Sequence, residues 1–459
     1  MEQAFLVAKV LFWILALGVV VLPKRWALLS YLVVMHIDLS GPLFASSSSV
    51  GLENLLKVIG LPLILLIRTQ FKPLTNTKIT WAFILWSTLI LYATLTTFWS
   101  PFLLSGIKMV FYLYAYLLIF LIFVHGWSEG WIDDSLVVMS LWLVLGLAIL
   151  QTYILGNPFG AFKIVKEFRF TSFTHAQGFA GYLIAVLAII LFSGRTSFLK
   201  AASIGAILIG IILTGSRYVF FGMVFLFFFA WLSLFFKKDR SEPRNRLLDL
   251  TKKFFAPACV VIALLAIANF APDNRLSQLA ESNNGGSEKG VGTFIWRLGI
   301  YERALTTMPD RDIFPLIFGS GTSSGAQLVL GYDSRYSEDS IDANRVVHSD
   351  FIRTFYEWGL LGGFIFLSFL GASLVSYLNL AIVKKSTTAL AFIGLFPNLL
   401  FGLAIENILT ASSSPDGIGI VLVMAYGAAT RKSGEENAIV LKSRKKAPRL
   451  SSELLGNGR

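Results

Sequence analysis

Long apolar runs, separated by short polar stretches, dominate the pattern of the chain. Runs such as 4–22 and 105–125 exceed the roughly 18 residues that a helix needs to cross the apolar core of a bilayer. A membrane β-barrel would instead alternate apolar and polar positions in segments of about ten residues. The pattern therefore predicts an all-α, polytopic membrane protein.

The apolar runs define approximate membrane spans, which lie at 3–22, 26–39, 53–67, 80–98, 105–125, 134–155, 177–193, 198–213, 218–236, 254–270, 356–381, 387–410 and 415–430. Thirteen spans place the N-terminus outside the cell. Twelve spans, with the short segment before Asp38 re-entrant, place both termini inside. Both topologies are open at this point, so we expect 12–13 transmembrane helices.

One polar segment is long enough to form a separate extracytoplasmic unit that contains short helices. The predicted organisation has four parts, namely an N-terminal helix bundle (1–270), a large extracytoplasmic loop (271–355), C-terminal membrane helices (356–430) and a basic cytoplasmic tail (431–459).

Composition agrees with this organisation and excludes a soluble enzyme. Hydrophobic residues make up 55% of the chain and charged residues 14%, whereas soluble domains carry roughly 25% charged residues. The net charge of +12 does not indicate a nucleic-acid partner, because basic residues collect in the cytoplasmic loops of membrane proteins. The single cysteine, Cys259, excludes an internal disulfide and a cysteine-based metal cluster.

The distribution of charge predicts which segments face the cytoplasm. Residues 237–253 hold seven basic and three acidic residues, and the tail 431–459 holds eight basic and three acidic residues. The large loop 271–355 holds eleven acidic and eight basic residues, so its net charge is −3. By the positive-inside rule, the first two segments are cytoplasmic and the large loop is outside.

Two polar groups at the outer ends of predicted membrane helices need an explanation. Arg217 follows Thr214-Gly215-Ser216, in a turn too short to carry a cation away from the membrane. Such a residue is often functional, although its side chain could also snorkel to lipid headgroups. His348 ends the large loop, where Arg345 and Asp350 flank it, and imidazole takes and releases protons near neutral pH.

The large loop contains a second candidate position. Arg297 and Tyr301 are four residues apart, so segment 294–305 is predicted to form a short helix that presents both on one face. The Asp310-Arg311-Asp312 segment superficially resembles a metal-binding D-x-D element, but its position between two prolines favours a solvated loop. No zinc-protease, P-loop or α/β-hydrolase motif is present.

Taken in order, these residues resemble the O-antigen ligase/polymerase superfamily, the Wzy/WaaL-like integral membrane glycosyltransferases of polysaccharide assembly. The resemblance extends from Trp99 to the last membrane helix. Its elements are Trp99-Ser100-Pro101 before Lys108, Arg169 with Phe173-Thr174-His175, Ser216-Arg217, Arg297-x-x-x-Tyr301, Gly319-Ser320-Gly321, and His348-Ser349 followed nine residues later by Gly359-Leu360-Leu361-Gly362. The last element matches the pattern H-[NSQ]-x9-G-x-x-[GTY] in full.

The resemblance implies transfer of a glycan from an undecaprenyl-diphosphate carrier to a sugar hydroxyl, at the outer face of the bacterial inner membrane. It implies an inverting enzyme without a metal or other cofactor. His348, Arg217 and Arg297 are the expected catalytic residues. The expected substrate-binding residues are Arg169, His175, Tyr301, Arg345 and Lys108.

Three functions remain open at this stage. The leading interpretation is a polymerase of O-antigen or exopolysaccharide repeat units, because Ser349-Asp350-Phe351 is similar to exopolysaccharide and capsule polymerases. The close alternative is a ligase that moves the polymer onto lipid A core or a protein. A transporter or flippase is the alternative of another class, although the internal symmetry of transporters is not visible. Expected partners are the lipid-linked donor, a glycan or lipid-linked acceptor, membrane lipids and a chain-length regulator.

Overall fold

A computed structural model describes residues 2–39, 52–69, 80–156, 169–193, 198–236, 292–332, 347–383, 386–405, 408 and 415–429. Its elements are helices, and no strand occurs among these residues. The predicted span 254–270, two parts of the predicted loop 271–355 (271–291 and 333–346) and the basic tail 431–459 lie outside the described residues. Within the described part, the prediction of an all-α polytopic protein is confirmed.

The first membrane segments are α1 (Glu2–Val21) and α2 (Lys24–Val34), separated by Pro23. Next come α3 (Leu52–Leu55), the π-helical turn η1 (Leu56–Gly60) and α4 (Leu61–Thr69). At about 1.5 Å per residue, the 11 residues of α2 extend only about 16 Å, which is too short for a bilayer core. This length fits the re-entrant alternative for the segment before Asp38.

The next hairpin contains α5 (Thr80–Thr96), the 3₁₀ turn η2 (Thr97–Trp99) and α6 (Leu103–Glu129). Then α7 (Asp134–Ile149) continues into the π-helical turn η3 (Leu150–Ile154). The α7 N-terminus is capped by the Asp133 carboxylate, which accepts a hydrogen bond from Leu136 N at 2.8 Å. A cap of this kind satisfies a main-chain donor that has no partner inside the helix.

The centre of the bundle is α8 (Ala176–Phe192), whose residues are almost all buried. It packs against α9 (Phe198–Thr214), α10 (Arg217–Phe236), α17 (Ala389–Ile405) and α18 (Pro415–Ala429). An apolar helix buried on every side is expected in the interior of a bundle. The ends of α8, α10 and α17 can therefore form one continuous region.

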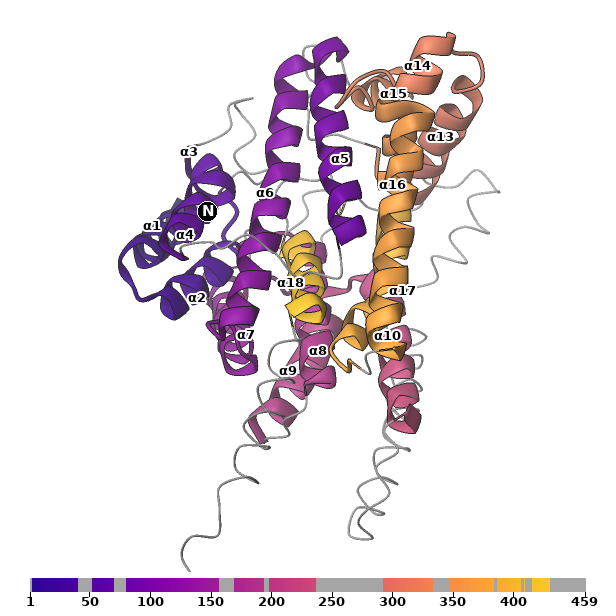
Figure 1. Cartoon of the computed structure of the whole chain (residues 1–459). Coiled ribbons are helices and arrows are strands. Elements are labelled where there is room, and N and C mark those ends of the chain that lie inside the picture. The colour runs from indigo at the N-terminus through magenta and orange to yellow at the C-terminus, as the bar shows by residue number, and fades with distance from the viewer. Residues whose placement is uncertain are drawn as a thin grey trace, which may run out of the picture.

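Three shorter helices of the predicted loop are α13 (Gly292–Thr307), α14 (Ile313–Phe318) and α15 (Ala326–Tyr332). They lie beside the first part of α16 (Asp350–Ile382), as Figure 1 shows. The helix predicted over 294–305 is thus confirmed as part of α13. The short helices predicted in the loop are present in its described part.

Five described helices are long and apolar enough to cross a membrane, namely the segments Gln3–Val21, Trp81–Trp99, Leu103–Glu129, Asp134–Ile154 and Asp350–Ile382. Five further apolar helices of 10–17 residues accompany them among the described residues. The chain is therefore a multi-pass membrane protein.

A backbone break divides α16 into a short first segment and a long apolar one. Gly359 has φ 65° and ψ −168°, values that a residue with a Cβ atom rarely adopts. A Cβ atom built on Gly359 would lie 2.4 Å from Ile317 O and 2.5 Å from Gly319 N. The break therefore lets the 317–321 segment approach the main chain of α16.

Candidate functional site

Two side chains of α13 are attached to the last turn of α17. Arg297 Nη1 donates a hydrogen bond to Ile405 O at 2.8 Å, and Tyr301 OH lies 3.4 Å from Ala404 O. The last carbonyl groups of a helix have no intrahelical partner, so they accept bonds from arginine or tyrosine side chains. Arg297 and Tyr301 therefore share one face, as their spacing predicts, and that face meets the C-terminal end of α17.

The same tyrosine joins this helix end to the segment before α16. Its hydroxyl donates a hydrogen bond to the main-chain oxygen of His348. Ser349 then caps α16, because its Oγ accepts a bond from Ile352 N at 3.3 Å. The Asp350 carboxylate accepts a bond from Ile408 N at 2.7 Å, beyond the end of α17. His348, which is half-buried, thus lies in a segment fixed on both sides.

The turn that carries Arg217 lies at the same end of the bundle. Helix α9 ends at Thr214, Gly215 has φ 63°, and α10 begins at Arg217, so the short turn predicted between these two helices is confirmed. The adjacent Tyr218 donates a hydrogen bond to Gln177 O of α8 at 3.1 Å. Its ring also lies 3.6 Å from where a Cβ of Gly402 in α17 would stand. The beginning of α10 therefore lies between α8 and α17.

The segment before α8 carries Arg169 and His175 and is anchored by its main chain. Phe170 N donates to Leu213 O at 3.1 Å, one residue before the end of α9. Asp38 N donates to Phe173 O at 2.7 Å, which joins the segment to the residues after α2. His175 is exposed and stands at the N-terminus of α8. Both predicted residues therefore lie near the α9–α10 turn.

The structure thus brings together most of the sequence-predicted site residues near the beginnings of α8, α10 and α16 and the end of α17, with α13 alongside. These residues are Arg169, His175, Arg217 (through its backbone), Arg297, Tyr301 and His348. Arg345 lies outside the described residues. Lys108 lies on α6 beside Met109, and Met109 belongs to a second group of polar contacts, which includes Arg353.

The Gly319–Gly325 segment, which we call the glycine-serine loop, docks on the turn between α5 and α6. Trp99 Nε1 donates to Gly319 O at 3.1 Å, and Ser100 Oγ donates to Thr322 O at 2.6 Å. Thr322 Oγ1 accepts a bond from Trp358 Nε1 at 3.0 Å and donates to Ala93 O at 2.6 Å. The Trp-Ser-Pro and Gly-Ser-Gly elements of the sequence are therefore in direct contact.

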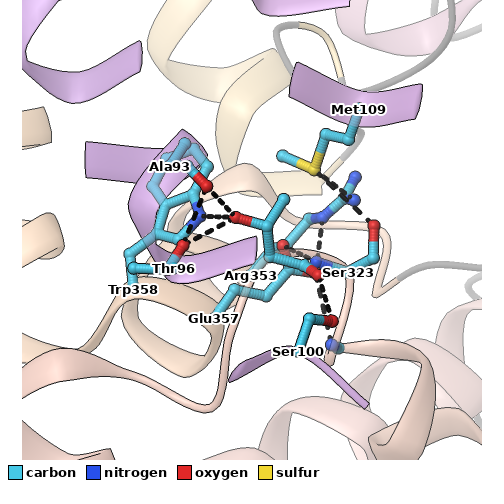
Figure 2. A network of polar contacts seen from close by, with 10 residues as sticks. Ala93, Thr96, Ser100, Met109, Ser323, Arg353, Glu357 and Trp358 are labelled. Carbon is cyan, nitrogen blue, oxygen red and sulfur yellow. Dashed lines mark hydrogen bonds and ion pairs between the residues drawn. The ribbon is translucent and has the colours of Figure 1, made fainter. Parts of the chain in front are cut away.

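Behind this loop lies a buried ion pair that the sequence analysis did not single out (Figure 2). Arg353 Nε lies 2.8 Å from Glu357 Oε1, and the two side chains are 2% and 0% exposed. The loop donates two further hydrogen bonds to the Glu357 carboxylate, from Ser323 N at 2.7 Å and from Gly325 N at 3.2 Å. The sequence offered one signal for this pair, namely opposite charges four residues apart at the start of a membrane helix.

The Asp310-Arg311-Asp312 segment is an irregular turn with both aspartates exposed, as predicted for a solvated loop, but its arginine has a partner. Arg311 stacks on the ring of Tyr356 at 3.5 Å and donates a bond to Tyr356 O at 3.2 Å. Arginine stacks well on aromatic faces, so this contact holds the segment against the first part of α16. Among the described residues, no group of three histidine, cysteine or acidic side chains has a metal-binding arrangement.

The arrangement at the end of α17 is suited to an anionic ligand. The N-termini of α8 and α10 carry partial positive charge, and their first N–H groups lack partners within the helix. Arg297 adds a guanidinium group, which carries five N–H donors in a planar fork. Helix N-termini and arginine forks are both established phosphate-binding elements.

Part of the chain matches a known protein family. Residues 202–367 match the family model Wzy_C, described as O-antigen ligase. The matched range includes Arg217, Arg297, Tyr301 and His348, whereas Arg169, His175 and Lys108 precede it. A comparison with curated proteins finds no match. Residues 202–367 are therefore similar to the O-antigen ligase domain of the Wzy/WaaL family of polysaccharide polymerases and ligases.

Proposed function

We propose that the chain transfers a glycan from undecaprenyl diphosphate to a sugar hydroxyl, and that it acts as a polymerase of polysaccharide repeat units. One observation carries this proposal. Arg297 and Tyr301 are attached to the C-terminal end of α17, and Tyr301 also binds residues 348–358, which we call the His348 segment. Both contacts lie beside the beginning of α10. The family match covers the same residues. The proposed site faces the outer side of the bacterial inner membrane.

In the proposed reaction, the acceptor hydroxyl oxygen attacks the anomeric carbon from the side opposite the diphosphate. The bond between this carbon and the phosphate oxygen breaks, and undecaprenyl diphosphate leaves with inversion at the anomeric carbon. The diphosphate is already a good leaving group, so the protein's task is to neutralise its growing charge and to orient the acceptor. No cofactor takes part in this scheme.

Arg297 and Arg217 are proposed to bind the diphosphate. A guanidinium group can donate two parallel hydrogen bonds to phosphate oxygens, and each bond to a charged group contributes about 1.5–3 kcal/mol. The bond from Arg297 to Ile405 O supports this role, since it fixes the orientation of the guanidinium before a ligand arrives. Arg169 and His175 are proposed as further substrate contacts near the α9–α10 turn, and Arg345 and Lys108 as contacts to the glycan.

His348 is proposed to take the proton of the acceptor hydroxyl, a role that contributes about 10²–10⁴ in rate. An alternative role for the same imidazole, as a cation, is to bind phosphate. The hydrogen bond from Tyr301 to the main-chain oxygen of His348 supports a fixed position in either case. Tyr301 is then a positioning residue that sets the distance between the imidazole and the acceptor.

Reconstitution tests this proposal directly. The full-length protein is placed in nanodiscs with a defined undecaprenyl-diphosphate-linked oligosaccharide, and new glycosidic bonds are detected by mass spectrometry. We expect chain growth with the wild type and at least a hundredfold slower growth with His348→Ala or Arg297→Ala. Arg303→Ala, on the same helix and six residues later, serves as the matched control and is expected to retain the wild-type rate. Absence of a glycosidic product with the wild type would refute the proposal.

A ligase is the second candidate, favoured by the description of the matching family as O-antigen ligase. Donor and site are shared by both reactions, which differ only in the acceptor. A strain that lacks the gene separates them. Accumulation of single lipid-linked repeats indicates a polymerase, whereas free long polymer with an unmodified lipid A core or protein indicates a ligase.

A further inference from the structure

The ion pair between Arg353 and Glu357 is almost completely buried. The desolvation of two buried charges can exceed their mutual attraction, so such a pair is weak evidence for a gain in stability. A buried pair persists where its remaining hydrogen-bonding groups are satisfied. The partners of these two side chains therefore indicate what the pair does.

Most of the partners belong to the glycine-serine loop. Glu357 Oε2 accepts a bond from Ser323 N at 2.7 Å, and Glu357 Oε1 accepts one from Gly325 N at 3.2 Å. Ser323 is the only non-glycine residue with a positive φ, 73°, in the described part of the chain. The carboxylate thus stabilises a backbone conformation that serine alone disfavours.

Arg353 and Glu357 lie in the first part of α16, and His348 lies just before the beginning of this helix. Only eight residues, mostly in the first part of α16, separate His348 from Glu357, and the segment ends at the Gly359 break. Ser349 caps this segment and Asp350 ties its beginning to Ile408 N. A movement of Glu357 relative to the loop is therefore transmitted to His348 through one helical unit.

The loop in turn rests on the turn between α5 and α6. Thr322 bonds to Ala93 O and lies 2.7 Å from Thr96 Oγ1, and Ser100 bonds to Thr322 O (Figure 2). Arg353 Nη2 lies 2.8 Å from Met109 Sδ of α6. The ion pair consequently joins two separate parts of the chain, the α5–α6 hairpin and the His348 segment.

We infer that Arg353 and Glu357 form a positioning clamp, which fixes the His348 segment relative to the α5–α6 hairpin. This inference rests on the proposed function, since it assigns the clamp to the placement of His348 in glycosyl transfer. A displacement of about 1 Å at a reacting group can cost about a hundredfold in rate. The clamp therefore acts on the rate of the bound complex rather than on donor binding.

Glu357→Gln tests the clamp because it preserves side-chain size but replaces one acceptor oxygen with an N–H₂ group that opposes a loop N–H. In the full-length protein in nanodiscs, we expect kcat for glycosyl transfer to fall at least tenfold and KM for the lipid-linked donor to change less than twofold. Hydrogen exchange at Ser323 and Gly325, measured by mass spectrometry, is expected to accelerate at least tenfold. The matched control is Glu302→Gln, at an exposed acidic residue on α13. We expect this variant to leave kcat, KM and hydrogen exchange unchanged.

A double variant separates positioning from folding. Arg353→Met with Glu357→Leu removes both charges, so no unpaired charge remains buried. Ser323 N and Gly325 N lose their acceptor, so we expect a folded protein with a lower thermal midpoint than the wild type. Low kcat in this folded variant supports the clamp, whereas wild-type kcat would overturn it and leave only a structural role. Unchanged loop exchange in Glu357→Gln would also overturn it. The exchange result is independent of catalysis, so an inactive wild type refutes the proposed function alone.

Discussion

Replacing Gly359 by alanine tests why α16 breaks at this residue. Its φ and ψ, 65° and −168°, lie in a region that is essentially restricted to glycine. An added Cβ would lie 2.4 Å from Ile317 O and 2.5 Å from Gly319 N, distances shorter than carbon–oxygen and carbon–nitrogen contacts allow. The substitution therefore imposes both backbone strain and a steric conflict with the 317–319 segment.

The expected cost follows from these two effects. Backbone strain at such a residue costs about 1–3 kcal/mol, and the insertion of a methyl group into a closely packed contact costs about 1–3 kcal/mol. Together they amount to about 2–6 kcal/mol, a large part of the about 5–15 kcal/mol that stabilises a folded domain. We expect Gly359→Ala to lower the free energy of unfolding by this amount, or to move the 317–319 segment away from α16.

The matched control lies in the same helix. Gly371 is exposed, and no described atom lies within 4 Å of a Cβ built there. In a helix, alanine is favoured over glycine by about 0.5–1 kcal/mol, so Gly371→Ala is expected to be neutral or slightly stabilising. The assay compares thermal unfolding midpoints of the three purified proteins in the same detergent. Equal midpoints for Gly359→Ala and Gly371→Ala would refute the assignment of the break to Gly359.

Three further substitutions test the site and its support. Tyr301→Phe removes the hydroxyl bond to His348 O; we expect at least tenfold slower glycosyl transfer, measured as kcat, in a protein that still folds, and a wild-type kcat would contradict the positioning role. Gly222→Val places a Cβ 2.3 Å from where the Asn398 Oδ1 lies in α17; we expect a loss of about 1–3 kcal/mol, measured by thermal unfolding, and a lower transfer rate. Arg311→Lys loses the stacking on Tyr356; we expect a loss of about 0.5–1 kcal/mol without a change in kcat, and a reduced kcat at unchanged stability would contradict a purely supporting role.

Much of the fold and of the candidate site was predictable, because the relevant signals are local. The length of apolar runs indicates membrane helices, and the short polar stretch between two such runs indicates the turn before α10. The spacing of Arg297 and Tyr301 predicts their common face on α13. The element His348-Ser349 also contains its own helix start, since serine is a preferred capping residue.

The remaining features depend on contacts between distant segments, which a single sequence does not reveal. Arg353 and Glu357 are ordinary helix-surface charges until the glycine-serine loop covers them. The stacking of Arg311 on Tyr356 was not predicted, because the sequence does not show that these two residues meet. The positive φ of Gly359 has the same origin, since it is required by the approach of the 317–319 segment.

The anchor points on the last turn of α17 are main-chain oxygens, those of Ala404 and Ile405. An atom shared by every amino acid cannot be deleted by exchanging one side chain for another. Alanine scanning across this turn would therefore leave both anchors intact and would underestimate its importance. We expect homologous chains to differ in residue type at this turn but to keep the position at which the helix ends. Insertions and deletions, rather than substitutions, are then the changes that natural selection removes.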